Sequence, residues 1–157
     1  NKEDWKRKEW VSEMVEEINS KDRYFRWFDS GDIYHTKLAE KIYEVCNATP
    51  HCQHWIPTRS YKFKKFKSVL AALDSLPNVV VRYSSDSILG EYTSGLHGST
   101  IMPDGHKDSS ITKCEAYERG GKCGNCRLCW NKDIDVIGYV QHGRKMRSVM
   151  LNKVKGE

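Results

Sequence analysis

Three strand-like segments recur at a nearly constant spacing, and this repeat constrains the fold more than any other feature of the sequence. The segments "RYFRWF", "QHWIP" and "NVVVRY" end near Phe28, Pro57 and Tyr83, which are 29 and 26 residues apart. A polar loop follows each segment, and at least two of these loops lead into a helix. Such spacing is typical of βα units, in which right-handed crossovers join parallel strands. We therefore predict an α/β fold of repeated βα units, with a parallel sheet that is open or partly closed like a barrel.

Three helices are predicted from apolar residues that recur every three or four positions. The first covers "DWKRKEWVSEMVEEINS" and precedes the first strand. The second begins with Thr36 as its N-cap, and the third covers "YKFKKFKSVLAALDSL" and ends before Pro77. The expected inner faces are Val11, Met14, Val15 and Ile18 in the first helix, Leu38, Ile42, Val45 and Cys46 in the second, and Phe63, Phe66, Leu70 and Leu73 in the third.

The repeat becomes irregular in the second half of the chain. Two further segments, "GSTIM" and "DVIGYV", predict strands, and a connection rich in Gly and Cys lies between them. The length suits a single α/β domain over residues 1–157. Within it we expect βα units in 1–87, a loop-rich metal-binding segment in 88–132, and a final strand with a basic tail in 133–157.

The composition is that of a soluble globular protein, with 30% charged and 38% hydrophobic residues. No apolar run approaches the roughly 20 residues needed to cross a bilayer, so no membrane partner is expected. The formal net charge of +5 favours nucleic acid or another polyanion only weakly.

Four of the six cysteines fall within 16 positions: Cys114, Cys123, Cys126 and Cys129. Disulfides are a poor explanation, because cysteines separated by two residues rarely pair and the chain exceeds the size of a disulfide-stabilised mini-scaffold. Thiolates are soft ligands that select zinc, copper(I) or iron–sulfur clusters. The spacing therefore predicts a metal centre.

An iron–sulfur cluster fits this spacing best. Three cysteines at successive x2 spacings with one more distant cysteine form the pattern of cubane ligation, and Gly120, Gly121 and Gly124 let the chain bend around a cluster. Lys122 and Arg127 would offset its negative charge. We predict a [4Fe–4S] cluster held by all four cysteines, with zinc as the alternative. A cluster with four protein ligands has no open iron, which favours a structural or electron-transfer role.

Polar loops follow all three predicted strands, as "DSGD", "TRS" and "SSDS". In parallel α/β folds, functional side chains gather at the carboxyl ends of the strands. The same residue types also favour turns and helix caps, so each loop alone is explained without a ligand. Together they predict a shared polar site whose ligand-binding candidates are Asp29, Asp32, Arg59, Ser84 and Asp86.

The motifs "FRWFDSGD", "HWIPTRS", "VVVRYSSDS" with "GLHGST", and "CEAYERGGKCGNCRLCW" together resemble a bacteriophage family called gene product 88-like. The resemblance spans about Trp5 to Gly143, and the last motif is the most specific. It implies a phage-encoded α/β protein in the cytoplasm of the infected host, with the four clustered cysteines as metal ligands and the three loops as the polar rim.

These sequence features suggest three alternative functions. The first is a phage iron–sulfur protein with a structural or electron-transfer role, and a redox partner or host protein as its partner. The second is a radical-type or other cluster-associated enzyme with a polar site at the strand ends. The Cys-x3-Cys-x2-Cys spacing of S-adenosylmethionine radical enzymes is absent, which argues against that chemistry. The third is a zinc-stabilised nucleic-acid-binding module, suggested by lysines interleaved with Phe63 and Phe66, although lysines on a helix are usually its solvated side.

Overall fold

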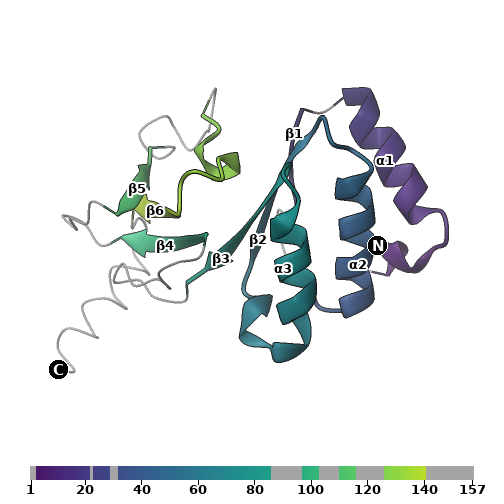
Figure 1. Cartoon of the computed structure of the whole chain (residues 1–157), viewed down its shortest axis with the longest axis horizontal. Helices are drawn as coiled ribbons and strands as arrows, with labels where there is room; N and C mark the ends of the chain where they lie inside the picture. Colours follow the sequence, from purple (N-terminus) through teal and green to yellow (C-terminus); the bar gives the residue numbers. More distant parts are fainter. Residues whose placement is uncertain are drawn as a thin grey trace. The chain divides into compact units, whose positions relative to one another are not determined.

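The structure, a computed structural model, describes residues 3–21, 23–28, 32–85, 97–102, 110–115 and 126–140. The chain divides into two compact units, Asn1–Arg82 and Tyr83–Glu157, called unit 1 and unit 2. Figure 1 shows the helices and strands of both units. Among the described residues, no helix combines the length and apolar character needed to span a membrane.

Unit 1 consists of alternating helices and strands. The parallel pairing of the first two strands is set by the register Tyr24↔Gln53, Phe25↔His54 and Arg26↔Trp55. The elements are η1 (Asp4–Lys6), α1 (Trp10–Lys21), β1 (Tyr24–Arg26), α2 (Thr36–Asn47), β2 (Gln53–Thr58), η2 (Ser60–Lys62), η3 (Lys64–Phe66), α3 (Lys67–Ser75) and β3 (Val79–Ser84), where η denotes a 3-10 turn. The last two residues of β3, Tyr83 and Ser84, belong to unit 2.

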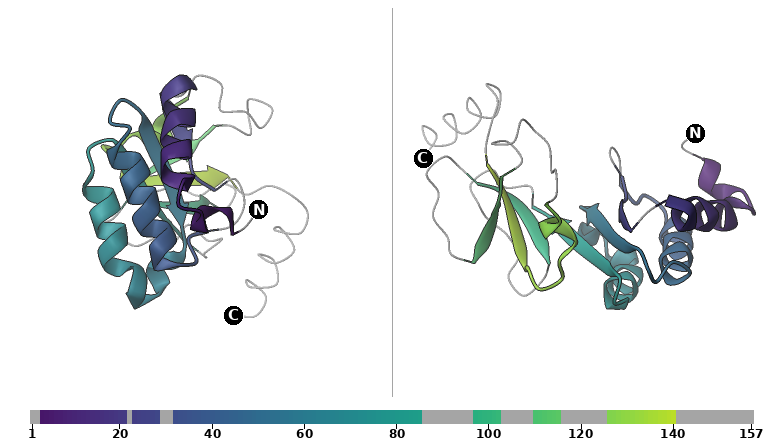
Figure 2. Two further views of the ribbon diagram at one scale, coloured as in Figure 1. Left: turned by 90° about the vertical axis from the view of Figure 1, so that its right-hand side faces the viewer. Right: turned by 90° about the horizontal axis from the view of Figure 1, so that it is seen from above.

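The three helices of unit 1 lie side by side on the same side of β1, β2 and β3 (Figures 1 and 2). Each new strand is added beside the previous one, in the order β1-β2-β3. Right-handed crossovers that always advance in one direction place the two crossover helices, α2 and α3, on the same face of a sheet. The predicted α/β fold with parallel strands is therefore confirmed.

The core of unit 1 forms where the apolar helix faces meet the sheet. Ile42, Val45 and Cys46 of α2 are fully buried, as the periodicity predicts, and Leu70 and Leu73 of α3 are buried as well. Burial of each such side chain contributes about 2 kcal/mol relative to leaving it in water.

Two details of the predicted helices are wrong. Thr36 is the first residue of α2 rather than its cap, because the Nδ1 atom of His35 accepts the hydrogen bond from the backbone N–H of Lys37 at 3.0 Å. The third helix begins at Lys67, and the preceding residues form two 3-10 turns. Phe63 stands between these turns with extended backbone and is 60% exposed, so it does not belong to the inner face.

Unit 2 contributes β4 (Gly98–Met102), β5 (Ile111–Cys114), η5 (Leu128–Trp130) and β6 (Val136–Val140). Among the described strands the order is β1-β2-β3-β4-β6-β5, and the pairings β3–β4, β4–β6 and β5–β6 are all parallel. The strands "GSTIM" and "DVIGYV" are thus confirmed. β5 lies in the segment that we predicted as loop-rich, because four residues are too few to show a strand pattern.

Close packing around Gly138 fixes β6 between β4 and β5. A Cβ atom at this position would lie 2.5 Å from Cγ2 of Ile111 and 2.5 Å from Sδ of Met102. Met102 and Ile111 form a buried cluster with Val136 on this face of the sheet. Alternate residues point to opposite faces, so Tyr139 points to the other face.

Candidate functional site

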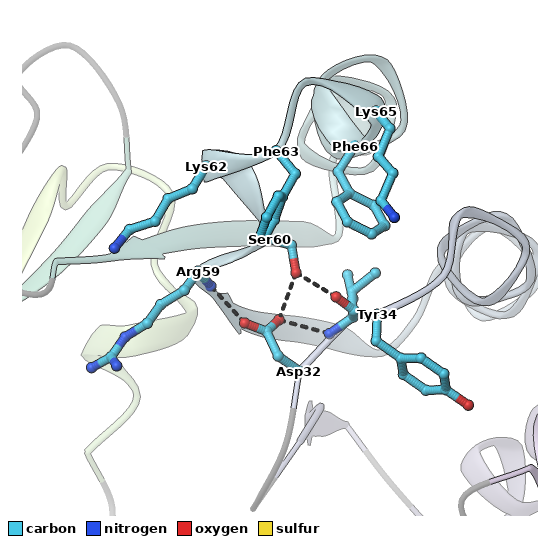
Figure 3. Close-up of a pocket in the computed structure, with 9 residues that line it drawn as sticks. Asp32, Tyr34, Arg59, Ser60, Lys62, Phe63, Lys65 and Phe66 are labelled. Carbon is cyan, nitrogen blue, oxygen red and sulfur yellow. Dashed lines mark hydrogen bonds between the residues drawn. The ribbon is translucent and has the colours of Figure 1, made fainter.

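Asp32 joins the loop that follows β1 to the loop that follows β2 (Figure 3). Its Oδ1 atom accepts hydrogen bonds from the backbone N–H of Ile33 at 2.7 Å and from the hydroxyl of Thr58 at 2.6 Å. Its Oδ2 atom accepts the backbone N–H of Arg59 at 2.7 Å. The hydroxyl of Ser60 lies 2.5 Å from the carbonyl oxygen of Ile33 and 3.2 Å from Oδ1. Asp32 is therefore a clip that holds two loops together, with both carboxylate oxygens already in use.

The structure brings together only some of the residues predicted to form the shared polar site. Asp32 contacts Arg59 through the Arg59 backbone, and the guanidinium extends away from the carboxylate (Figure 3). Ser84 belongs to unit 2, where its hydroxyl accepts a hydrogen bond from the hydroxyl of Ser99 at 3.2 Å. Asp29 and Asp86 lie outside the described residues. The shared polar site thus stays a prediction.

A cavity of about 370 Å³ opens beside the Asp32 clip. The side chains around it come from the loop after β1 and from the two 3-10 turns before α3. Its lining is Asp32, Ile33, Tyr34, Arg59, Ser60, Lys62, Phe63, Lys65 and Phe66. Three of these side chains are cationic and one is a carboxylate, so the cavity favours an anion.

The clustered cysteines lie in unit 2. Cys114 ends β5, and Cys126 and Cys129 flank the start of the turn η5. Cys114 and Tyr139 are in register between β5 and β6, so their side chains share one face of the sheet. The Sγ atom of Cys129 lies 3.3 Å from the hydroxyl oxygen of Tyr139. Tyr139 therefore contacts Cys129 and shares a sheet face with Cys114, which lies 15 residues earlier in the sequence.

The metal site itself is not assembled in the described part of the chain. Cys123 and its glycine-rich surroundings fall within residues 116–125, outside the described residues. Among those that are described, no three His, Cys, Asp or Glu side chains lie close enough together to hold a metal ion. The predicted ligand set accordingly stays a prediction, to which the structure adds the shared neighbourhood of Cys114 and Cys129.

Positive charge accompanies the cysteine segment. The guanidinium of Arg127 donates to the carbonyl oxygen of Cys126 at 2.8 Å, and its carbon lies 5.7 Å from the centre of the Trp130 ring. These contacts hold a cation next to the backbone of one of the proposed ligands.

The segment "HCQH" has a structural role that the sequence does not reveal. Both ring nitrogens of the buried His54 are engaged: Nδ1 accepts from Nε1 of Trp27 at 3.1 Å, and Nε2 lies 2.8 Å from the hydroxyl of Thr49. The Thr49 hydroxyl donates to the carbonyl oxygen of Val45 at 2.8 Å, so the proton of neutral His54 resides on Nε2. Burial, with a smaller contribution from His51, lowers the pKa of His54 to about 4.

The two remaining cysteines are core residues. Cys46 and Cys52 are fully buried in unit 1. Burial raises the pKa of the Cys46 thiol well above its ordinary value, which keeps the thiol protonated and unreactive. They thus serve as matched controls for the cysteines of unit 2.

A family model described as Gene product 88 matches residues 1–132, which include β1 to β5 and all four clustered cysteines. No curated protein and no solved structure matches the chain.

Proposed function

The chain belongs to the Gene product 88 family of phage proteins, and we propose that it is an iron–sulfur protein. A [4Fe–4S] cluster would be held by Cys114, Cys123, Cys126 and Cys129. The observation that carries the proposal is the position of Tyr139, which shares a sheet face with Cys114 and contacts Cys129. Two cysteines that are distant in sequence thus have a common neighbour in unit 2.

The four cysteines fit a [4Fe–4S] cluster in the chemical type and the number of their donor atoms. Four thiolates are the usual ligands of a cubane cluster, and the x2 spacings of Cys123, Cys126 and Cys129 follow its ligation pattern. The described cysteines are not gathered into a ligand group on their own, so the proposal rests on spacing, donor chemistry and the shared neighbour. When bound, a cluster of this kind supplies one-electron transfer or a cross-link between segments.

The residues around the thiols would tune such a group. The Tyr139 hydroxyl is placed to donate a hydrogen bond to the sulfur of Cys129, and Arg127 adds positive charge beside Cys126. Both interactions stabilise negative charge on sulfur. The protein would act in the cytoplasm of the infected host, with a redox partner or a host protein as its partner.

An absorption spectrum of protein purified without oxygen tests the proposal. A brown sample with a broad band near about 400 nm, lost on Cys126→Ser and kept on Cys46→Ala, is expected. Cys46 is a buried cysteine of unit 1 and has no part in the proposed ligand set. A colourless sample with one zinc per chain would replace the cluster by the zinc alternative.

A cluster-associated enzyme is the second candidate. The observation in its favour is that the loops after β1 and β2 meet at Asp32 beside a cavity. S-adenosylmethionine is expected to leave the EPR signal of the reduced protein unchanged, because four thiolates leave no open iron. A shifted signal would show an open iron and would move the enzyme to first place.

A further inference from the structure

The cavity of unit 1 combines an exposed aromatic ring with cationic side chains. Phe63 is 60% exposed, whereas Phe66, three residues later, is buried. The two rings lie 6.3 Å apart at 76°, in an edge-to-face arrangement, and both line the cavity. Phe63 therefore presents apolar surface to solvent at the edge of a concave site, where a flat ring can stack on it.

Positive charge surrounds these rings. Arg59 and Lys62 extend toward one side of the cavity, and Lys65 lies beside Phe66 with its Nζ atom 5.2 Å from the ring centre (Figure 3). Among the described lining residues the one carboxylate is Asp32, which already accepts hydrogen bonds from three N–H or O–H groups. The described lining thus carries three cationic side chains and one carboxylate, whose charge is offset by local donors.

We infer that this cavity binds a nucleotide, with the base against Phe63 and the phosphate held by Arg59 and Lys62. Every base has a flat face that stacks on an aromatic ring, and phosphate pairs with the planar guanidinium fork. The volume of about 370 Å³ lies within the range of small-ligand sites. A free mononucleotide and one unit of a single strand offer the same base and phosphate chemistry. The inference concerns unit 1 and is independent of the cysteine-bound group proposed for unit 2.

The cation–aromatic pattern of residues 62–66 is visible in the sequence, but its geometry is not. Along a continuous helix Phe63 would be an inner-face residue. The break between η2 and η3 turns Phe63 outward instead, so that it joins Lys62 and Lys65 around one cavity. The site therefore depends on the two 3-10 turns.

The test titrates the purified full chain with adenosine monophosphate and with a fluorescein-labelled oligothymidylate, by calorimetry and anisotropy. Phe63→Ala should weaken binding about tenfold, and Phe63→Trp should restore it. Lys62→Ala should weaken binding of both probes. For the oligonucleotide, it should also reduce the slope of log affinity against log salt concentration by about 1. Circular dichroism should show unchanged folding, because both replaced side chains are exposed.

Matched controls are available within the same unit. Lys64→Ala removes an exposed lysine next to the cavity but outside its lining, and Tyr24→Ala removes an exposed ring on β1. Both should keep the affinity of the parent. Binding of both probes would support a site for free nucleotides, and binding of the oligonucleotide alone would support a single-strand site. The inference would be overturned if neither probe bound, or if Phe63→Ala bound the probes as tightly as the parent. It would also be overturned if inorganic phosphate competed as well as adenosine monophosphate does.

Discussion

The hydroxyl oxygen of Tyr139 lies 3.3 Å from the Sγ atom of Cys129. The same tyrosine is in register with Cys114 across β5 and β6. One residue of the central strand of unit 2 therefore contacts one proposed ligand and shares a sheet face with another. The relationship gives Tyr139 a specific part in the proposed cluster site.

Tyr139→Phe should keep the cluster and lower its reduction potential. A hydrogen bond to sulfur stabilises the more negative reduced state, so its loss disfavours reduction. Spectroelectrochemical titration of the variant and the parent measures the difference. Tyr83→Phe, on β3, is the control and should leave the potential unchanged. An unaltered potential in Tyr139→Phe would show that the hydroxyl does not act on the group.

Cys126→Ser should lose the metal and make residues 88–132 sensitive to protease. This part of the chain has few apolar residues, so metal–thiolate bonds would supply its constraint. Limited proteolysis with mass mapping should show cleavage there, while unit 1 resists, because its core is formed by α1 to α3 and their strands. Cys46→Ala should behave like the parent toward the metal. Equal protease resistance in Cys126→Ser and the parent would contradict a folding role for the metal.

His54 should make the protein less stable as the pH falls from about 6.5 to about 4. Its pKa is about 4 in the folded chain, whereas the ordinary value for a histidine is 6.5. Within this window the unfolded chain takes up a proton that the folded chain excludes, so the free energy of unfolding decreases by about 3 kcal/mol toward acid. Above pH 6.5 the contribution is complete, and below pH 4 no further change arises from this residue.

Urea denaturation of the parent and of His54→Gln at a series of pH values measures this effect. His54→Gln should be less stable at pH 7, because it disturbs the bonds to Trp27 and Thr49. It should also lack the extra loss of stability between pH 6.5 and pH 4. Parallel pH curves for the two proteins would show that the imidazole does not exclude the proton.

Asp32→Ala should lower the free energy of unfolding by about 3 kcal/mol. The change leaves the backbone N–H of Arg59 and the hydroxyl of Thr58 without a charged acceptor. Arg59→Ala is the matched control, because Arg59 donates to Asp32 through its backbone and should change stability by less than about 0.5 kcal/mol. A comparable loss in both variants would show that the Arg59 side chain, rather than the clip, holds the loops.

The βα architecture could be predicted from the sequence because its signals are local. Strand spacing, the apolar faces of the helices, and the buried run of Val79, Val80 and Val81 all act within short segments. Parallel pairing then follows from the handedness of crossovers. Strand β5 could not be predicted, because "ITKC" is short and takes its register from β6.

The candidate site depends on contacts between distant residues, which local patterns do not reveal. Asp32 meets Thr58 across 26 residues, and His54 meets Trp27 across 27. Nothing in either local sequence distinguishes a side chain with tertiary partners from a turn residue or a metal ligand. The break at Phe63 also interrupts a helix that the local periodicity favours, so the periodicity alone does not predict it.

The most direct test of the proposed cluster is the content of iron and acid-labile sulfide in chain purified without oxygen. A [4Fe–4S] group predicts about four iron and four sulfide per chain in the parent and in Cys46→Ala, and neither in Cys126→Ser. One zinc per chain with no sulfide, or iron that persists in Cys126→Ser, would contradict ligation of a cluster by these cysteines.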